Sequence, residues 1–163
     1  VYKRQVWVSP RNAAEMARAT CRALVDVDPT HAGAYETGLD SLLADLDALN
    51  RAIRRSLAGT AGRRFLVHHP SWGYFARDYG LEQVAIEREG KEPSPRGIAS
   101  LVETARRLGI RTVFASPQFT TRSAEVVARE IGGRVVLVDP LGRDYIGTMR
   151  AAAKAFGASF EKN

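Results

Sequence analysis

Short apolar runs alternate with longer helical segments through the second part of the chain, and this alternation most constrains the fold. Strands that alternate with helices are typical of βαβ units, which place the strands parallel in one sheet. The change of period follows a glycine-containing turn at 59–62. We therefore predict an α/β fold with a four-stranded, mainly parallel sheet flanked by helices. The predicted strands are Phe65–His68, Gln83–Ile86, Thr112–Ala115 and Val135–Val138, and the predicted helices cover about 71–79, 95–108, 121–131 and 143–156.

Two helices are predicted ahead of this α/β region. Ser9-Pro10 and Asp28-Pro29 each combine a residue that caps a helix N-terminus with a proline suited to the first helical turn. After the second of these signals, apolar residues recur every three or four positions, so one long helix is expected over 30–58. At 1.5 Å per residue this helix would be about 40 Å long. Such a length fits either a bundle helix or a strut between two lobes.

Composition limits the class of protein. The chain has 163 residues and a net charge of +6, enough for one domain or for one domain with an attached piece. Its basic residues are spread along the sequence without a dense block or interleaved aromatics, so we expect no nucleic-acid partner. Cys21 is the only cysteine, which excludes an internal disulfide and a cysteine-rich zinc site. No apolar run approaches the roughly 20 residues of a membrane-spanning helix.

Chemically useful side chains follow the predicted strands, and open parallel sheets bind ligands at the carboxyl ends of their strands. His69 and Asp139 each come directly after a predicted strand, and an imidazole nitrogen with a carboxylate oxygen suits zinc or manganese. His68 points the other way and is expected to be a packed or hydrogen-bonded neighbour. Taken alone, the residues leave His69 open as a metal ligand or a structural histidine. Two further stretches occupy the same edge, Glu87-Arg88-Glu89 and Ser116-Pro117-Gln118.

A hydrolytic site is the alternative chemistry at this edge. Ser116 follows the third predicted strand and could act as a nucleophile with His69 and Asp139. However, Ser116 precedes a proline and lacks the G-x-S-x-G turn that exposes the nucleophile of α/β hydrolases. The nucleotide-binding signatures G-x-G-x-x-G and G-x-x-x-x-G-K-[ST] do not occur in the sequence. These other chemistries fit the strand-end residues less well than a metal site does.

Several short motifs, taken in order and with their spacing, resemble a known family. They are W-x-S-P at 7–10, H-x-x-x-x-Y-F at 69–75, Y-G-L at 79–81, E-P-S at 92–94, P-Q-F at 117–119 and D-P-L at 139–141. Together they extend over nearly the whole chain. In this respect the sequence resembles the zinc/manganese-binding proteins of ABC importers, the ZnuA/TroA-like family.

This resemblance implies a two-lobe architecture. In the family, two α/β lobes are joined by one long rigid helix, and a metal ion is held in the cleft between the lobes. Residues 1–29 would then be a remnant of the N-terminal lobe, 30–58 the long inter-lobe helix and 63–163 the C-terminal α/β lobe. The resemblance therefore favours a strut between two lobes over a bundle helix for residues 30–58.

The resemblance also implies the metal ligands. The histidine that opens H-x-x-x-x-Y-F and the aspartate of D-P-L are the family's ligands from the C-terminal lobe, and they match His69 and Asp139. Other members carry glutamate at the first position and are adapted to manganese, so His69 implies zinc, with manganese as the alternative. The remaining two ligands of the family are histidines of the first lobe. One lies upstream of this chain, and the other belongs to a D-P-H-x-W motif where Gln5 stands here.

The departures from the family pattern lead to two expectations. Agreement begins sharply at Val6-Trp7, so residues 1–5 are expected not to be native to the gene; the alternative is a real substitution that weakens the site. Ser116 replaces the acidic or amide residue often found before P-Q-F, which puts a supporting role at this position in doubt.

The resemblance finally implies a function. It indicates a monomeric, non-catalytic protein, periplasmic or anchored at the cell surface, that delivers a divalent metal ion to the membrane subunit of an ABC permease. Because two ligands cannot complete the four-coordinate shell of zinc, the chain alone is expected to bind zinc weakly or not at all.

Overall fold

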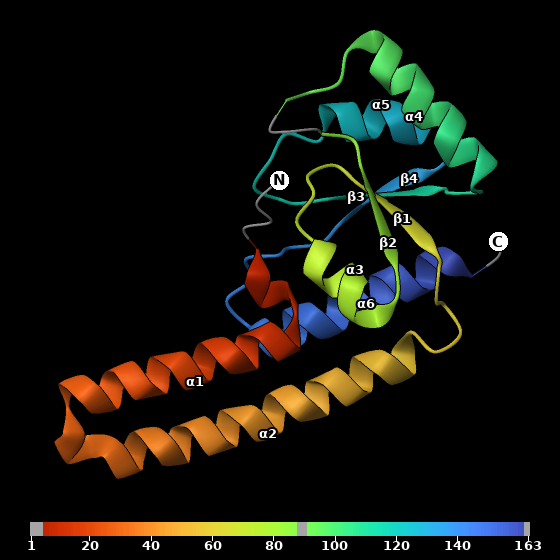
Figure 1. Cartoon of the computed structure of the whole chain (residues 1–163). Helices are drawn as coiled ribbons and strands as arrows, with labels where there is room; N and C mark the ends of the chain where they lie inside the picture. Colours follow the sequence, from red (N-terminus) through yellow and green to blue (C-terminus); the bar gives the residue numbers. More distant parts are fainter. Residues whose placement is uncertain (1–4, 88–90, 162–163) are drawn as a thin grey trace.

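The computed structural model describes residues 5–87 and 91–161, which form an α/β unit and a long helical hairpin that extends from it (Figure 1). The predicted fold class is confirmed, because a long helix is followed by a four-stranded parallel sheet with helices on both faces. Residues 1–4, most of the segment expected to be non-native, lie outside the described residues.

All four strands of the sheet run parallel. Their order across the sheet is β2-β1-β3-β4, and the predicted strands lie within one residue of the observed bounds. In this order β3 lies between β1 and β4, so the loop that follows β3 lies between the loops that follow those two strands. The bounds are Arg64–Val67 for β1, Glu82–Ala85 for β2, Thr112–Ala115 for β3 and Arg134–Leu137 for β4.

Side chains of the strands alternate between two apolar cores, one on each face of the sheet. Phe65 and Val67 of β1 lie in one core with residues of α2, α3 and α6, whereas Leu66 lies in the other with residues of α4 and α5. This arrangement fixes the sheet between two helical layers. The helices are α2 (Ala32–Ser56), α3 (Gly73–Tyr79), α4 (Pro95–Arg107), α5 (Arg122–Glu130) and α6 (Tyr145–Phe160).

An aromatic cluster centred on Phe156 joins α6 to the sheet. The Phe156 side chain is fully buried. Its ring centroid lies 4.5 Å from that of Phe65 and 4.7 Å from that of Phe114, on β1 and β3. The rings of Trp72 and Phe75, at the start of α3, each lie 5.3 Å away. These contacts bring α3, α6, β1 and β3 together in the core on one face of the sheet.

Helix α1 (Pro10–Val27) and α2 form the antiparallel hairpin (Figure 1). Ser9 caps α1, as predicted, because its hydroxyl accepts the backbone N–H of Asn12 at 3.0 Å. Helix α2 has 25 residues and is therefore about 37 Å long, two residues shorter at each end than the predicted helix over 30–58. Among the described residues, no helix is both long and apolar enough to cross a membrane.

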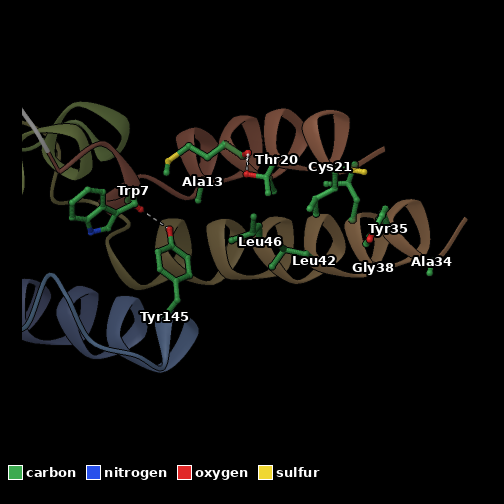
Figure 2. A pocket seen from close by; sticks show the side chains of 14 residues that line it. Trp7, Ala13, Thr20, Cys21, Ala34, Tyr35, Gly38, Leu42, Leu46 and Tyr145 are labelled. Atoms are coloured by element: carbon green, nitrogen blue, oxygen red, sulfur yellow. Dashed lines mark hydrogen bonds between the residues drawn. The ribbon is translucent and has the colours of Figure 1, made fainter. Parts of the chain in front are cut away.

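The α/β unit supports only the inner half of the hairpin. The buried residues of α2 are Leu46, Leu49 and Ile53, all in its C-terminal half. An apolar groove of about 550 Å³ lies between α1 and α2 and extends from Trp7 and Tyr145 at the α/β unit along the hairpin (Figure 2). Leu42 in this groove is 43% exposed. The role of α2 as a strut to another lobe stays a prediction.

The segment before α1 packs on the α/β unit. Val8, in a short 3₁₀ turn at Val6–Val8, is fully buried in the core that contains Phe156. The Tyr145 hydroxyl donates a hydrogen bond to the Trp7 carbonyl at 2.8 Å (Figure 2). Burial raises the pKa of the Tyr145 hydroxyl, which keeps this group protonated as a donor. The assignment of residues 1–29 to a first lobe stays a prediction.

We expect Phe156→Ala to lower the free energy of unfolding by about 3–5 kcal/mol, because it leaves a cavity in the aromatic cluster. Phe160→Ala is a matched control in the same helix, since Phe160 is only partly buried, and it should cost clearly less. Urea denaturation measures both. A loss below about 1 kcal/mol for Phe156→Ala would show that the cluster does not hold α6 on the sheet.

Candidate metal centre

The backbone ladder continues beyond β1 and places His69 at the carboxyl edge of the sheet. The N–H of His68 donates to the carbonyl of Phe114 at 2.7 Å, and the N–H of Glu87 donates to the carbonyl of His68 at 3.0 Å. The N–H of Ser71 then donates to the carbonyl of His69 at 2.8 Å, which closes a tight turn. The backbone on both sides of the His69 side chain is therefore hydrogen-bonded.

The two neighbouring histidines have different surroundings. The His68 side chain is 4% exposed, and its Nε2 lies 3.1 Å from Oε1 of Glu92. The His69 side chain is 24% exposed, its Nδ1 lies 2.7 Å from Oε2 of Glu87, and its ring packs against Phe119 with centroids 4.9 Å apart. The prediction that His68 is a packed, hydrogen-bonded neighbour is confirmed. Within 5–87 and 91–161, no hydrogen-bond partner approaches Nε2 of His69.

Asp139 is anchored through one oxygen. Its Oδ1 accepts the Gln118 side-chain amide at 2.6 Å and the backbone N–H of Leu141 at 2.8 Å. In the part of the chain that the structure describes, no hydrogen bond reaches Oδ2. The carboxylate is thus held in place through Oδ1, and Oδ2 is available to bind a metal ion.

The loop that follows β3 contacts both candidate ligands. It closes with a hydrogen bond from the N–H of Phe119 to the carbonyl of Ser116 at 3.2 Å. From this loop, Phe119 packs on the ring of His69 while Gln118 binds Asp139. Because β3 lies between β1 and β4, its loop bridges the two strand ends that carry His69 and Asp139.

The N-terminal segment reaches the same edge of the sheet. The Trp7 indole N–H donates to the carbonyl of Pro140 at 2.8 Å, directly after Asp139. Gln5, which stands where the resemblance implies a histidine ligand, is two residues before Trp7. Through this hydrogen bond, Trp7 holds the segment that follows Gln5 against the backbone next to Asp139.

The site offers donors of two kinds, one imidazole nitrogen and one carboxylate oxygen, and zinc accepts both. Within the described ranges, no group of three or more His, Cys, Asp or Glu side chains is placed to hold a metal ion. The described residues therefore fit part of a metal site and not a complete four-coordinate shell.

The geometry does not support the hydrolase alternative. Ser116 is only 4% exposed. No hydrogen bond among the described residues joins its side chain to His69, and His69 pairs with Glu87 and not with Asp139. A serine–histidine–aspartate relay is therefore not assembled.

Sequence reasoning missed Glu87 and Gln118 as partners of the candidate ligands. Both lie in stretches predicted to occupy this edge, and that location was the available signal. Which edge residues face each other depends on the order of the strands, which the sequence pattern does not specify. Arg88 and Glu89 of the same stretch lie outside the described residues.

A parallel sheet with donor side chains at its carboxyl edge defines an α/β binding lobe. The chain belongs to the family described as "Zinc-uptake complex component A periplasmic", whose sequence model matches residues 3–158. The match begins inside the segment 1–5, whose origin stays a prediction.

Individual relatives agree with this assignment. The chain is 32% identical over 151 residues to a "Putative metal-binding protein" of Chlamydia trachomatis, with 92% of this chain and 55% of the relative covered. It is 28% identical over 146 residues to the "High-affinity zinc uptake system protein ZnuA" of Brucella abortus, with 88% and 43% covered. The chain thus spans about half the length of the curated relatives that it matches.

Solved structures show the same fold. A "Crystal structure of ZnuA" superposes with a TM-score of 0.94 at 38% identity and covers 98% of this chain and 62% of that structure. A ZnuA deletion mutant with zinc bound gives the same TM-score at 37% identity, with 100% and 63% covered. The laminin-binding protein Lmb of Streptococcus agalactiae, at 22% identity and a TM-score of 0.90 over 99% of this chain and 65% of that structure, shows the fold alone.

Asp139→Ala should expose the Leu141 amide to hydrogen exchange, because it removes the oxygen that this N–H donates to. A lost hydrogen bond of about 1 kcal/mol corresponds to roughly a fivefold faster exchange. Asp139→Asn keeps an acceptor and should change exchange less. Hydrogen-exchange NMR measures both, with the Val138 amide, bonded to Ala115 in the sheet, as the internal reference. Equal Leu141 rates in wild type and Asp139→Ala would contradict the anchoring of Asp139.

Proposed function

We propose that this chain is the C-terminal lobe, with its linking helix, of an extracytoplasmic solute-binding protein that captures zinc and delivers it to the membrane permease of an ABC importer. The observation that carries the proposal is the placement of His69 and Asp139 at one sheet edge, each hydrogen-bonded through one atom. Their second metal-binding atoms, Nε2 of His69 and Oδ2 of Asp139, have no hydrogen-bond partner among the described residues. The protein acts as a monomer, in the periplasm or at the cell surface. It binds and releases its cargo and catalyses no reaction.

Zinc is the preferred cargo in this proposal because of the donor types. Imidazole nitrogen is a good ligand for zinc, whereas sites built from carboxylates and water suit manganese better. The relatives named for zinc uptake point in the same direction. Manganese is the alternative cargo.

Zinc capture requires more than this lobe supplies. Zinc prefers four ligands, and His69 and Asp139 supply two. The other donors would come from a first lobe across a cleft, so that bound metal holds the two lobes together. The permease would then distinguish the metal-bound protein from the metal-free protein by the arrangement of the lobes.

The chain alone should bind zinc with modest affinity. Complete structural zinc sites in peptides gain about 10–16 kcal/mol. Half of that free energy corresponds to a Kd between about 1 μM and 0.2 mM. Calorimetric titration should show this affinity for wild type, weaker binding of manganese, and no measurable zinc binding in His69→Ala.

His31→Ala is the matched control for this titration. His31 lies at the start of α2, its side chain is 69% exposed and it pairs with Asp28. Its removal should leave the zinc affinity unchanged. Zinc binding that persists in His69→Ala and disappears in His31→Ala would refute the proposal. Nanomolar binding that disappears in His69→Ala would show that the chain supplies further ligands.

A further inference from the structure

Glu87 holds the ring of His69 in one orientation. Oε2 of Glu87 lies 2.7 Å from Nδ1 of His69, and the Glu87 side chain is only 13% exposed. The backbone of Glu87 is itself fixed, because its N–H donates to the carbonyl of His68 and the preceding Ile86 N–H donates to Val67. The carboxylate therefore projects from the sheet ladder beside β1 and not from a free loop.

This contact determines which ring nitrogen of His69 can bind a metal ion. A carboxylate oxygen only accepts hydrogen bonds, so Nδ1 carries the shared hydrogen. In the neutral ring the other nitrogen, Nε2, then has a free lone pair. Phe119 packs on the same ring, so both the proton position and the ring plane are constrained.

We propose that Glu87 is a positioning residue for the metal site: it fixes the Nδ1–H tautomer of His69 and presents Nε2 to zinc. The proposal rests on the proposed function and adds a residue to it. A carboxylate on the far nitrogen also increases the basicity of a coordinating imidazole, and loss of such a partner typically weakens metal binding by about 10–100-fold. Glu87 itself does not contact the metal ion.

The neighbouring pair in the chain provides a matched control. Glu92 lies 3.1 Å from Nε2 of His68, the buried histidine beside His69. Glu92→Leu removes the same charge from the neighbouring glutamate–histidine pair and leaves the partner of His69 in place. A general electrostatic role for acidic residues would make the two glutamates equivalent. If Glu87 acts by positioning His69, only its substitution should change the His69 tautomer and the zinc affinity.

The test follows the ring signals of His69 by long-range ¹H–¹⁵N NMR in the whole chain, first without metal and then with added zinc. In wild type we expect a protonated Nδ1 and an unprotonated Nε2, with zinc perturbing Nε2. In Glu87→Leu we expect a mixture of tautomers and zinc binding about 10–100-fold weaker. Glu87→Gln, whose amide oxygen can still accept Nδ1–H, should restore the tautomer and part of the affinity. Glu92→Leu should leave both unchanged.

The outcomes separate the two proposals. An unchanged tautomer and an unchanged zinc affinity in Glu87→Leu would overturn the role of Glu87 and leave the proposed function standing. Zinc that coordinates Nδ1 in wild type, with the ring hydrogen on Nε2, would overturn the role as well, since Nδ1 would then face the metal ion. Failure of zinc to perturb the His69 ring in wild type would instead overturn the proposed function. Urea denaturation of each variant confirms that the comparison is made between folded proteins.

Discussion

The site depends on the continuation of the sheet ladder through His68. This residue donates to β3 and accepts from Glu87, so the backbone beyond β1 is held on both sides. Backbone groups in a buried ladder are costly to leave unpaired, and this constraint prevents the two histidines from exchanging roles. The His68 side chain is buried in the interior. The His69 side chain lies at the carboxyl edge, where Glu87 and Phe119 fix its ring.

Local sequence signals were sufficient for most of the fold. Each predicted strand matches the observed strand to within one residue, because each is a short apolar run that begins within three residues of a glycine, and α1 begins at the predicted Ser9-Pro10 signal. The candidate ligands were also found from sequence, since strand ends are the expected binding edge. The contacts of Glu87 with His69 and of Gln118 with Asp139 cannot be predicted from the sequence pattern, because they follow from the order of the strands. Trp7 stands out in the sequence as part of a motif. Its hydrogen bond to Pro140 cannot be predicted in the same way, because the two residues lie far apart in the chain.

Within the proposed function, a lobe that supplies two of the four zinc ligands couples metal binding to the arrangement of the lobes. If one lobe supplied all four ligands, zinc would bind tightly whatever the position of the other lobe. A lobe with two anchored donors binds weakly on its own and tightly only when the remaining donors close over the ion, so occupancy becomes coupled to lobe arrangement. Anchoring by Glu87 and Gln118 limits the ordering cost that binding would otherwise incur.

Anomalous diffraction at the zinc absorption edge, from crystals of this chain grown with zinc, tests the central claim most directly. We expect a peak within about 2.0–2.2 Å of both Nε2 of His69 and an oxygen of Asp139, with Glu87 still hydrogen-bonded to Nδ1. A zinc ion bound through Nδ1, or zinc bound elsewhere while His69 and Asp139 remain without metal, would contradict it.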